Sequence, residues 1–322
     1  MKNTNSSPRS KSTKRPSKSN GSLKTILSKL LEMMSKKNSG VDPEELNRFR
    51  EKIQTVWNYT PTVCIFGQAG AGKSSLCNAL FGEDVFKISP TEACTKTRQD
   101  HTFEIGMKGK LRIIDMPGMG ESHDKDATYQ ALYEETVTHA DLVIWALKSD
   151  SRAYASDIRA WKLISKRLGE LDIPVFFLLT QADKIDPTHE WIKRKSLPGS
   201  EQLGNLLLKK KVIARDFGVD SLTVVPVSST TGYGLKDLVL AMLVSLPDEK
   251  KTGFYKLTNS SVQTDEAKKE ADKGFFNAIF KWCKESAKTV FEFIVNNRSE
   301  IIEIGLTILT VFLSKGKGRR RK

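Results

Sequence analysis

The stretch Gly67-Gln-Ala-Gly-Ala-Gly-Lys-Ser74 decides the fold class of this 322-residue chain. It fits the pattern GxxxxGK followed by Ser or Thr, and it lies between the apolar run 63–66 and a helical stretch that continues from Ser75. Glycines let the backbone curl so that successive N–H groups face a phosphate, and the N-terminal end of a helix adds partial positive charge. The stretch therefore predicts a phosphate-binding loop between a strand and a helix.

The residue types of this loop suit the binding of a nucleotide. Lys73 would reach the β- and γ-phosphates, where its charge would also assist phosphoryl transfer, and the Ser74 hydroxyl would ligate Mg²⁺. We therefore predict Lys73 as a catalytic residue and Ser74 as a metal ligand. The predicted nucleotide-binding residues of the loop are Gly67, Gln68, Ala69, Gly70, Ala71, Gly72, Lys73, Ser74 and Ser75.

Apolar runs of strand length alternate with helical stretches through the middle of the chain. This alternation predicts an α/β fold, with a mainly parallel sheet flanked by helices. In such a sheet the carboxyl ends of the strands meet at one edge, where ligands bind. The apolar runs are 63–66, 111–114, 142–147, 175–179 and 222–227.

A second motif, which contains an acidic residue, begins at the end of the predicted strand 110–115. Asp115 ends this strand, and Gly118 follows three residues later. At the carboxyl end of a strand beside a phosphate loop, Asp115 would hold a water on Mg²⁺, and the Gly118 N–H would bond the γ-phosphate. Loss of that phosphate would release the loop, which is the behaviour of a switch.

A third motif, at the end of the strand 175–180, suits a base rather than a phosphate. Asp183 would accept hydrogen bonds from N1–H and the 2-amino group of guanine. Adenine has an acceptor at N1 and no 2-amino group, so the mismatch would cost ~1 to 3 kcal/mol or more. The carboxylate therefore predicts selectivity for GTP and GDP.

The order of these motifs resembles the G motifs of the Era-like branch of the translation-factor-related GTPases, over about residues 59–247. Further local matches resemble the small prophage-encoded GTPases of bacteria: Cys94-Thr95 with Gln99, 120–122 with Asp126, 140–145, and 180–187 with Trp191. The resemblance implies a P-loop G domain, with Thr95 as the switch-I ligand of Mg²⁺. It also implies that the base is held by Thr180, Gln181, Asp183, Lys184, Ser228 and Ser229.

Two departures from the family pattern bear on activity. Met119 follows Gly118 where related enzymes carry a glutamine that orients water, so hydrolysis of GTP should be slow without a partner. Gln181 replaces the lysine of the guanine motif. The leading interpretation is a GTP-hydrolysing switch, with Lys73, Thr95 and Gly118 as catalytic residues. The alternative is a module that holds guanine nucleotide without significant turnover.

The charge of the chain is concentrated at its ends. The formal net charge is +14, and residues 1–20 and 315–322 each hold six Lys or Arg and no acidic residue. Two helices are predicted before the sheet, an amphipathic one over 22–37 and another from Pro43 to Trp57. The predicted divisions are a disordered basic tail (1–21), a helical extension (22–58), a G domain (59–247), a linker or solvated helix (248–273), a helical segment packed on a membrane or on the G domain (274–314), and a basic tail (315–322).

Basic ends favour an anionic partner. An anionic membrane surface is one candidate, since both terminal segments carry apolar helical stripes, and RNA or the ribosome is a second. A switch would also need an effector or an activating protein. Four cysteines without metal-ligand spacing, and no apparent signal peptide, favour a cytoplasmic protein with peripheral membrane association as an option.

Overall fold

The computed structural model describes residues 23–82, 99–104, 110–115 and 134–303 of the chain. The chain divides into two compact units. We call residues 47–288 the central unit, and residues 1–46 with 289–322 the terminal unit. In the described ranges, no helix is long and apolar enough to cross a bilayer.

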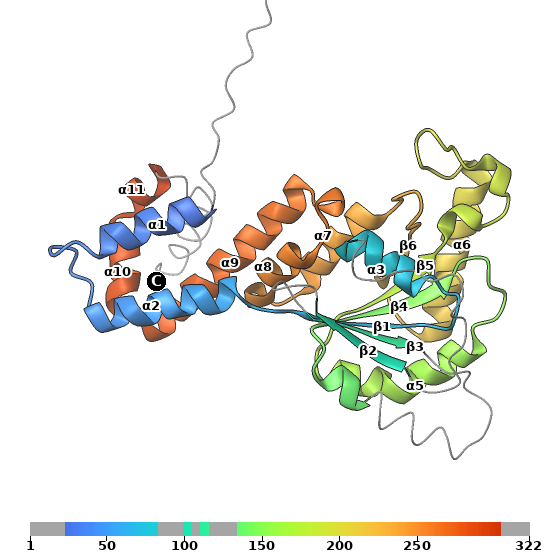
Figure 1. Cartoon of the computed structure of the whole chain (residues 1–322), viewed down its shortest axis with the longest axis horizontal. Helices are drawn as coiled ribbons and strands as arrows, with labels where there is room; N and C mark the ends of the chain where they lie inside the picture. Colours follow the sequence, from blue (N-terminus) through green and yellow to red (C-terminus); the bar gives the residue numbers. More distant parts are fainter. Residues whose placement is uncertain (1–22, 83–98, 105–109, 116–133, 304–322) are drawn as a thin grey trace, which may run out of the picture. The chain divides into compact units, whose positions relative to one another are not determined.

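A six-stranded sheet forms the middle of the central unit, in the order β2-β3-β1-β4-β5-β6 (Figure 1). Strand β2 is antiparallel to β3, and the other neighbouring pairs are parallel. The predicted α/β class with a mainly parallel sheet is therefore confirmed. The strands are β1 (Thr62–Phe66), β2 (Gln99–Glu104), β3 (Lys110–Asp115), β4 (Leu142–Lys148), β5 (Val175–Thr180) and β6 (Val224–Pro226).

Alternating side chains of the strands enter two separate cores, one on each face of the sheet. Val63 and Ile65 of β1 belong to the core on one face, and Cys64 and Phe66 belong to the other. Helices α3 (Lys73–Phe81), α7 (Leu235–Ser245) and α8 (Asp248–Leu257) cover the first face. Helices α5 (Ala155–Glu170) and α6 (Ser200–Phe217) cover the second. Both faces are thus buried, as a parallel sheet requires.

The linker predicted over 248–273 is instead packed structure. It contains α8, the short 3-10 helix η5 (Ser260–Val262) and the first part of α9 (Asp265–Ser286). Phe254, Leu257 and Val262 are buried in the same core as β1 and α3. The polar composition misled the prediction because several of these charges are paired: Lys250 Nζ lies 2.8 Å from Asp141, and Lys251 Nζ lies 2.5 Å from Glu270.

The terminal unit joins the two ends of the described chain. Its helices are α1 (Leu23–Met34), the start of α2 (Pro43–Trp57), α10 (Lys288–Asn296) and α11 (Arg298–Glu303). The carboxylate of Glu45 accepts hydrogen bonds from Thr289 N and Oγ1, both at 2.7 Å, and from Val290 N at 3.4 Å. Burial alone would raise the pKa of Glu45, but these hydrogen bonds outweigh burial and lower it. Glu45 therefore caps the start of α10.

The apolar stripes predicted for the terminal segments are largely buried. α1 and α2 match the two predicted helices, and the buried side chains of α1 are Ile26, Leu27, Leu30 and Met34. Val290, Phe293 and Ile294 of α10 are buried as well. These positions are thus occupied in packing within the fold, so they offer little apolar surface to a bilayer.

Candidate functional site

The loop of residues 67–72 leaves the carboxyl end of β1 and enters α3. Gly67 has a φ of 147°, and a Cβ atom there would collide with the carbonyl oxygen of Ala146 in the neighbouring strand β4. Gly72 precedes the first residue of α3 in a left-handed conformation, with a φ of 82°. Only glycine adopts these conformations without strain, so the loop can curl tightly around an anion.

Lys73 is held inside this loop. Its side chain is buried, and its Nζ donates hydrogen bonds to the carbonyl oxygens of Gly67 at 2.7 Å and Gln68 at 2.9 Å. The first N–H groups of α3 have no acceptor within their own helix. The ammonium group and these N–H groups belong to one short segment, so positive charge is concentrated where the sequence predicts phosphate binding.

The end of β5 is bonded directly to the phosphate loop. Thr180 Oγ1 donates to the carbonyl oxygen of Ala71 at 2.7 Å, and Gln181 Nε2 donates to that of Gly70 at 3.2 Å. Gln181 in turn accepts a hydrogen bond from Lys184 Nζ at 3.0 Å. The two predicted motifs are therefore neighbours in space, although about 110 residues separate them in the sequence.

Asp183 and the loop at 228–229 lie on the same side of the site. Ala182 N, beside Asp183, donates to Val227 O at 3.0 Å, which aligns the ends of β5 and β6. Ser228 is fully buried, and its Oγ accepts from Thr231 N at 3.2 Å. Among the described residues, the Asp183 carboxylate has no hydrogen-bond or ion-pair partner. It is thus available to a ligand.

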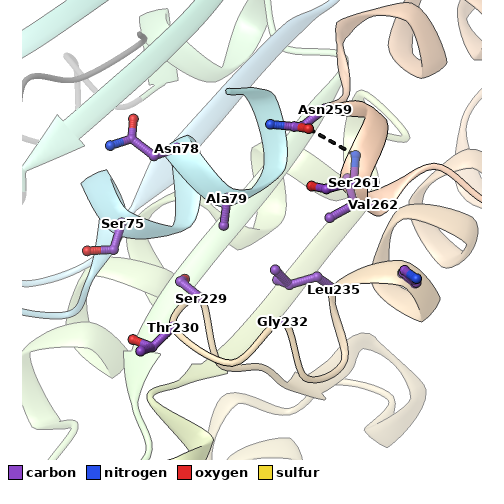
Figure 2. Close-up of a pocket in the computed structure, with 11 residues that line it drawn as sticks. Ser75, Asn78, Ala79, Ser229, Thr230, Gly232, Leu235, Asn259, Ser261 and Val262 are labelled. Atoms are coloured by element: carbon purple, nitrogen blue, oxygen red, sulfur yellow. Dashed lines mark hydrogen bonds between the residues drawn. The ribbon is translucent and has the colours of Figure 1, made fainter. Parts of the chain in front are cut away.

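A pocket of about 410 Å³ opens beside these residues (Figure 2). Ser75 of α3 and Ser229 line it, and both are predicted nucleotide-binding residues. Asn259 and Ser261 form a further part of the wall, and Asn259 N donates to Leu80 O at 2.7 Å near the end of α3. Sequence reasoning missed this wall because residues 259–261 fall in the segment predicted as a linker.

The predicted Mg²⁺ ligands are only partly described. Ser74 is the second residue of α3, and Asp115 is the last residue of β3, which pairs with β1 in parallel. A hydroxyl and a carboxylate at the same edge of the sheet fit the oxygen ligands that Mg²⁺ prefers. Thr95, Gly118 and Met119 lie outside the described residues. The described part of the chain contains no cluster of three His, Cys, Asp or Glu side chains that would hold a metal by itself.

The side chain of Gln68 is directed toward α5, which sequence reasoning did not predict. Gln68 Nε2 donates at 2.5 Å to both Ser156 Oγ and Asp157 Oδ2, in the first turn of α5. Asp157 is buried, and its other oxygen accepts from Trp145 Nε1 at 3.0 Å. Burial raises the pKa of Asp157, although these hydrogen bonds and the nearby Lys73 oppose the increase. The contact anchors the phosphate loop to α5.

We expect Gln68→Glu to destabilise the protein, because it places a second carboxylate against the buried Asp157. The expected loss is about 2 to 4 kcal/mol of unfolding free energy, or several degrees in the melting temperature. Adding Asp157→Asn should restore most of the lost stability, since the asparagine amide can donate a hydrogen bond to the new glutamate. Thermal unfolding of the parent, both single variants and the double variant measures this coupling.

The pH dependence of the Gln68→Glu variant provides a second test. Repulsion between the buried Asp157 and a carboxylate at the half-buried position 68 raises the pKa of the pair above the values in the unfolded chain. The defect should therefore be largest near neutral pH and should shrink as the pH falls towards the ordinary carboxyl range. A double variant as unstable as Gln68→Glu alone at neutral pH would contradict the assigned contact.

The chain is similar to several known GTPases. A family model described as "50S ribosome-binding GTPase" matches residues 62–181. The uncharacterized proteins YfjP and YkfA of Escherichia coli K12 are each 31% identical, over 233 and 237 residues, which cover 72% of this chain and 78% of each relative. The solved structure of Aquifex aeolicus Era bound to GDP and AlF4⁻ has 23% identity and a TM-score of 0.40, and covers 58% of this chain and 57% of Era.

Proposed function

Because the chain belongs to the Era-like small GTPases, we propose that it is a molecular switch that hydrolyses GTP to GDP and phosphate with Mg²⁺. The observation that best supports this is the direct contact between the phosphate loop and the guanine motif, through Thr180 Oγ1 and Ala71 O at 2.7 Å. This contact keeps Lys73 and Asp183 at one edge of the sheet. A single guanine nucleotide would bridge them, with its phosphates on α3 and its base at Asp183.

In the proposed mechanism the chain acts by positioning and by charge stabilisation. The Lys73 ammonium and the N–H groups at the start of α3 bind the β- and γ-phosphates and oppose the negative charge of the transition state. Ser74, Thr95 and Asp115 would hold Mg²⁺, which neutralises charge on the phosphate oxygens. The Gly118 N–H would donate a hydrogen bond to the γ-phosphate. Release of this phosphate after hydrolysis would then free the segment that follows β3.

Intrinsic turnover should be slow, because Met119 has no polar group to orient the attacking water. A relative with a glutamine at this place and no activating protein turns over at roughly 10⁻⁴ to 10⁻³ s⁻¹, and we expect a rate no higher than this range. An activating protein would then supply the missing group. A module that binds guanine nucleotide without hydrolysis is the competing proposal.

Single-turnover hydrolysis separates the two proposals. We expect protein loaded with GTP to release phosphate slowly with Mg²⁺, and more than about tenfold more slowly when the metal is chelated. Ser74→Ala should reproduce the loss at limiting Mg²⁺, whereas Ser245→Ala, at an exposed position in α7, should keep the metal dependence of the parent. Stable retention of intact GTP by the Mg²⁺-bound parent over several days would favour the nucleotide-holding module.

The basic ends support proposals about partners. Residues 1–20 and 315–322 carry twelve of the 52 Lys and Arg residues and no acidic residue. We propose that these ends contact an anionic membrane surface, with RNA or the ribosome as the alternative. Both segments lie outside the described residues.

A further inference from the structure

Helix α6 is apolar on two faces. Ile213 and Phe217 are buried in the core against the sheet, and Leu206 is buried with Ala182 and Ile185 after β5. Leu203 and Leu207 lie on one flank of this buried stripe and Leu208 lies on the far side, and they remain 40%, 50% and 61% exposed. An ordinary helix at this place carries polar residues on its outer side, so these leucines need another explanation.

The neighbouring helix α5 shows the ordinary pattern. It covers the same face of the sheet as α6, and its buried positions include Ala160, Ile164 and Leu168. Its exposed positions include Arg159, Lys162, Lys166, Gly169 and Glu170, with no large apolar side chain among them. The exposed leucines are therefore a property of α6 rather than of all helices on this face.

The loop before α6 adds two further apolar side chains. Ile192 and Leu197 form an antiparallel bridge, with Ile192 N donating to Leu197 O at 2.8 Å, and they are 42% and 45% exposed. Side chains directly opposite in an antiparallel pair project to the same side. The bridge therefore presents Ile192 and Leu197 together in the loop that precedes α6.

Cations lie beside the bridged pair. Lys193, Arg194 and Lys195 fill the loop between the bridged residues, and all three are exposed. Lys211 of α6 is also exposed, whereas Arg215 is paired with Asp216 at 2.8 Å and Lys209 donates to Ser151 O. We define the α6 outer face as Ile192, Leu197, Leu203, Leu207 and Leu208 with the cations of the 193–195 loop. It combines apolar side chains with strong positive charge.

We propose that the α6 outer face docks on an anionic lipid bilayer. The leucines and the bridged pair would enter the boundary between headgroups and acyl chains, while the cations would remain among anionic headgroups. This contact lies in the central unit and is independent of the basic ends. It also does not depend on nucleotide hydrolysis, because it uses none of the residues assigned to the nucleotide site.

Other occupants fit the α6 outer face less well. In a symmetric dimer the same face would meet itself, and the three exposed cations of the 193–195 loop on each side would repel. RNA would use the cations but gives no reason for five exposed aliphatic side chains, because bases stack on aromatic residues. A bilayer with anionic lipids satisfies both parts of the surface.

The test measures binding of the full chain to vesicles of phosphatidylcholine, with or without about 30% phosphatidylserine, in low and high salt. Lys193→Glu with Lys195→Glu should weaken binding to the anionic vesicles by about 100-fold or more in low salt. Leu203→Ser with Leu207→Ser should remove most of the binding that persists in high salt, because apolar insertion is not screened.

Matched controls change the same residue types elsewhere in the central unit. Lys162→Glu with Lys166→Glu alters exposed lysines on α5, and Leu222→Ser with Val244→Ser alters residues that are 76% and 59% exposed. Both control pairs should bind vesicles like the parent. All variants should keep the nucleotide affinity of the parent. Unchanged affinity would show that the variants fold, and it would separate a loss of lipid binding from a failure of the nucleotide site.

Several outcomes would overturn the proposal. Failure of the parent to bind anionic vesicles would contradict it directly. Variants of the α6 outer face that bind as tightly as the parent would show that other segments hold the lipid. Loss of a dimer in the leucine variant, measured by light scattering without lipid, would assign the face to a second copy. Binding of RNA that needs the lysines but not the leucines, without binding to vesicles, would assign it to nucleic acid.

Discussion

Lys73→Met should weaken GTP binding by about 100-fold or more, because it removes the charge that faces the phosphates and keeps the length of the buried stem. In the structure the Lys73 ammonium already bonds the carbonyl oxygens of Gly67 and Gln68, so it is held in place before a ligand arrives. Two or more charge-assisted hydrogen bonds to phosphate are each worth about 1.5 to 3 kcal/mol. Calorimetric titration with GTP and GDP measures the loss.

The Lys73 test needs a control for the change in charge and for folding. Lys162→Met removes an exposed lysine from α5 and should leave nucleotide affinity unchanged. The melting temperature of Lys73→Met in the absence of nucleotide shows whether the loop still folds, since the substitution also removes two hydrogen bonds. A folded Lys73→Met variant that binds GTP as tightly as the parent would refute the role of the phosphate loop.

Asp183→Asn should exchange guanine selectivity for xanthine selectivity. The parent carboxylate has no partner among the described residues and would accept from guanine N1–H and the 2-amino group. Xanthine carries a carbonyl oxygen at C2, which the amide of asparagine would satisfy by donating to it. We expect GTP affinity to fall, and XTP affinity to rise, by about 2 to 4 kcal/mol each.

Competition between fluorescent GDP and unlabelled GTP, XTP or ATP measures this exchange. Asp186→Asn is the matched control, because Asp186 is an exposed acid three residues further along. It should keep the GTP preference of the parent. Parent protein that binds ATP as tightly as GTP, or an Asp183→Asn variant with unchanged preference, would show that Asp183 does not read the base.

The geometry of the phosphate loop was predictable because its motif is local. The glycines of residues 67–72 and the helix that follows are adjacent in the sequence, so backbone geometry and helix polarity alone predict an anion site. The role of Asp183 is a prediction of the same local kind, since this residue follows a strand and its carboxylate is complementary to guanine. The roles of Thr95, Asp115 and Gly118 stay predictions, because their side chains or backbone are not described.

Other features of the site depend on residues that are far apart in the sequence. Asp157 follows Gln68 by 89 residues, and only the packing of α5 beside the phosphate loop brings their side chains together. Asn259 reaches the pocket because α8 packs on the core next to α3. Local periodicity cannot report such contacts, since it depends on neighbours within a few turns.

The sequence alone determined the α/β class and the phosphate loop, because glycine geometry and strand alternation act over short ranges. The tertiary structure decided which apolar and charged residues are buried. Phe254 and Leu257 of a polar segment enter the core, whereas Leu207 and Leu208 of an apolar segment remain at the surface. Burial depends on which elements pack on each face, and composition does not contain that information.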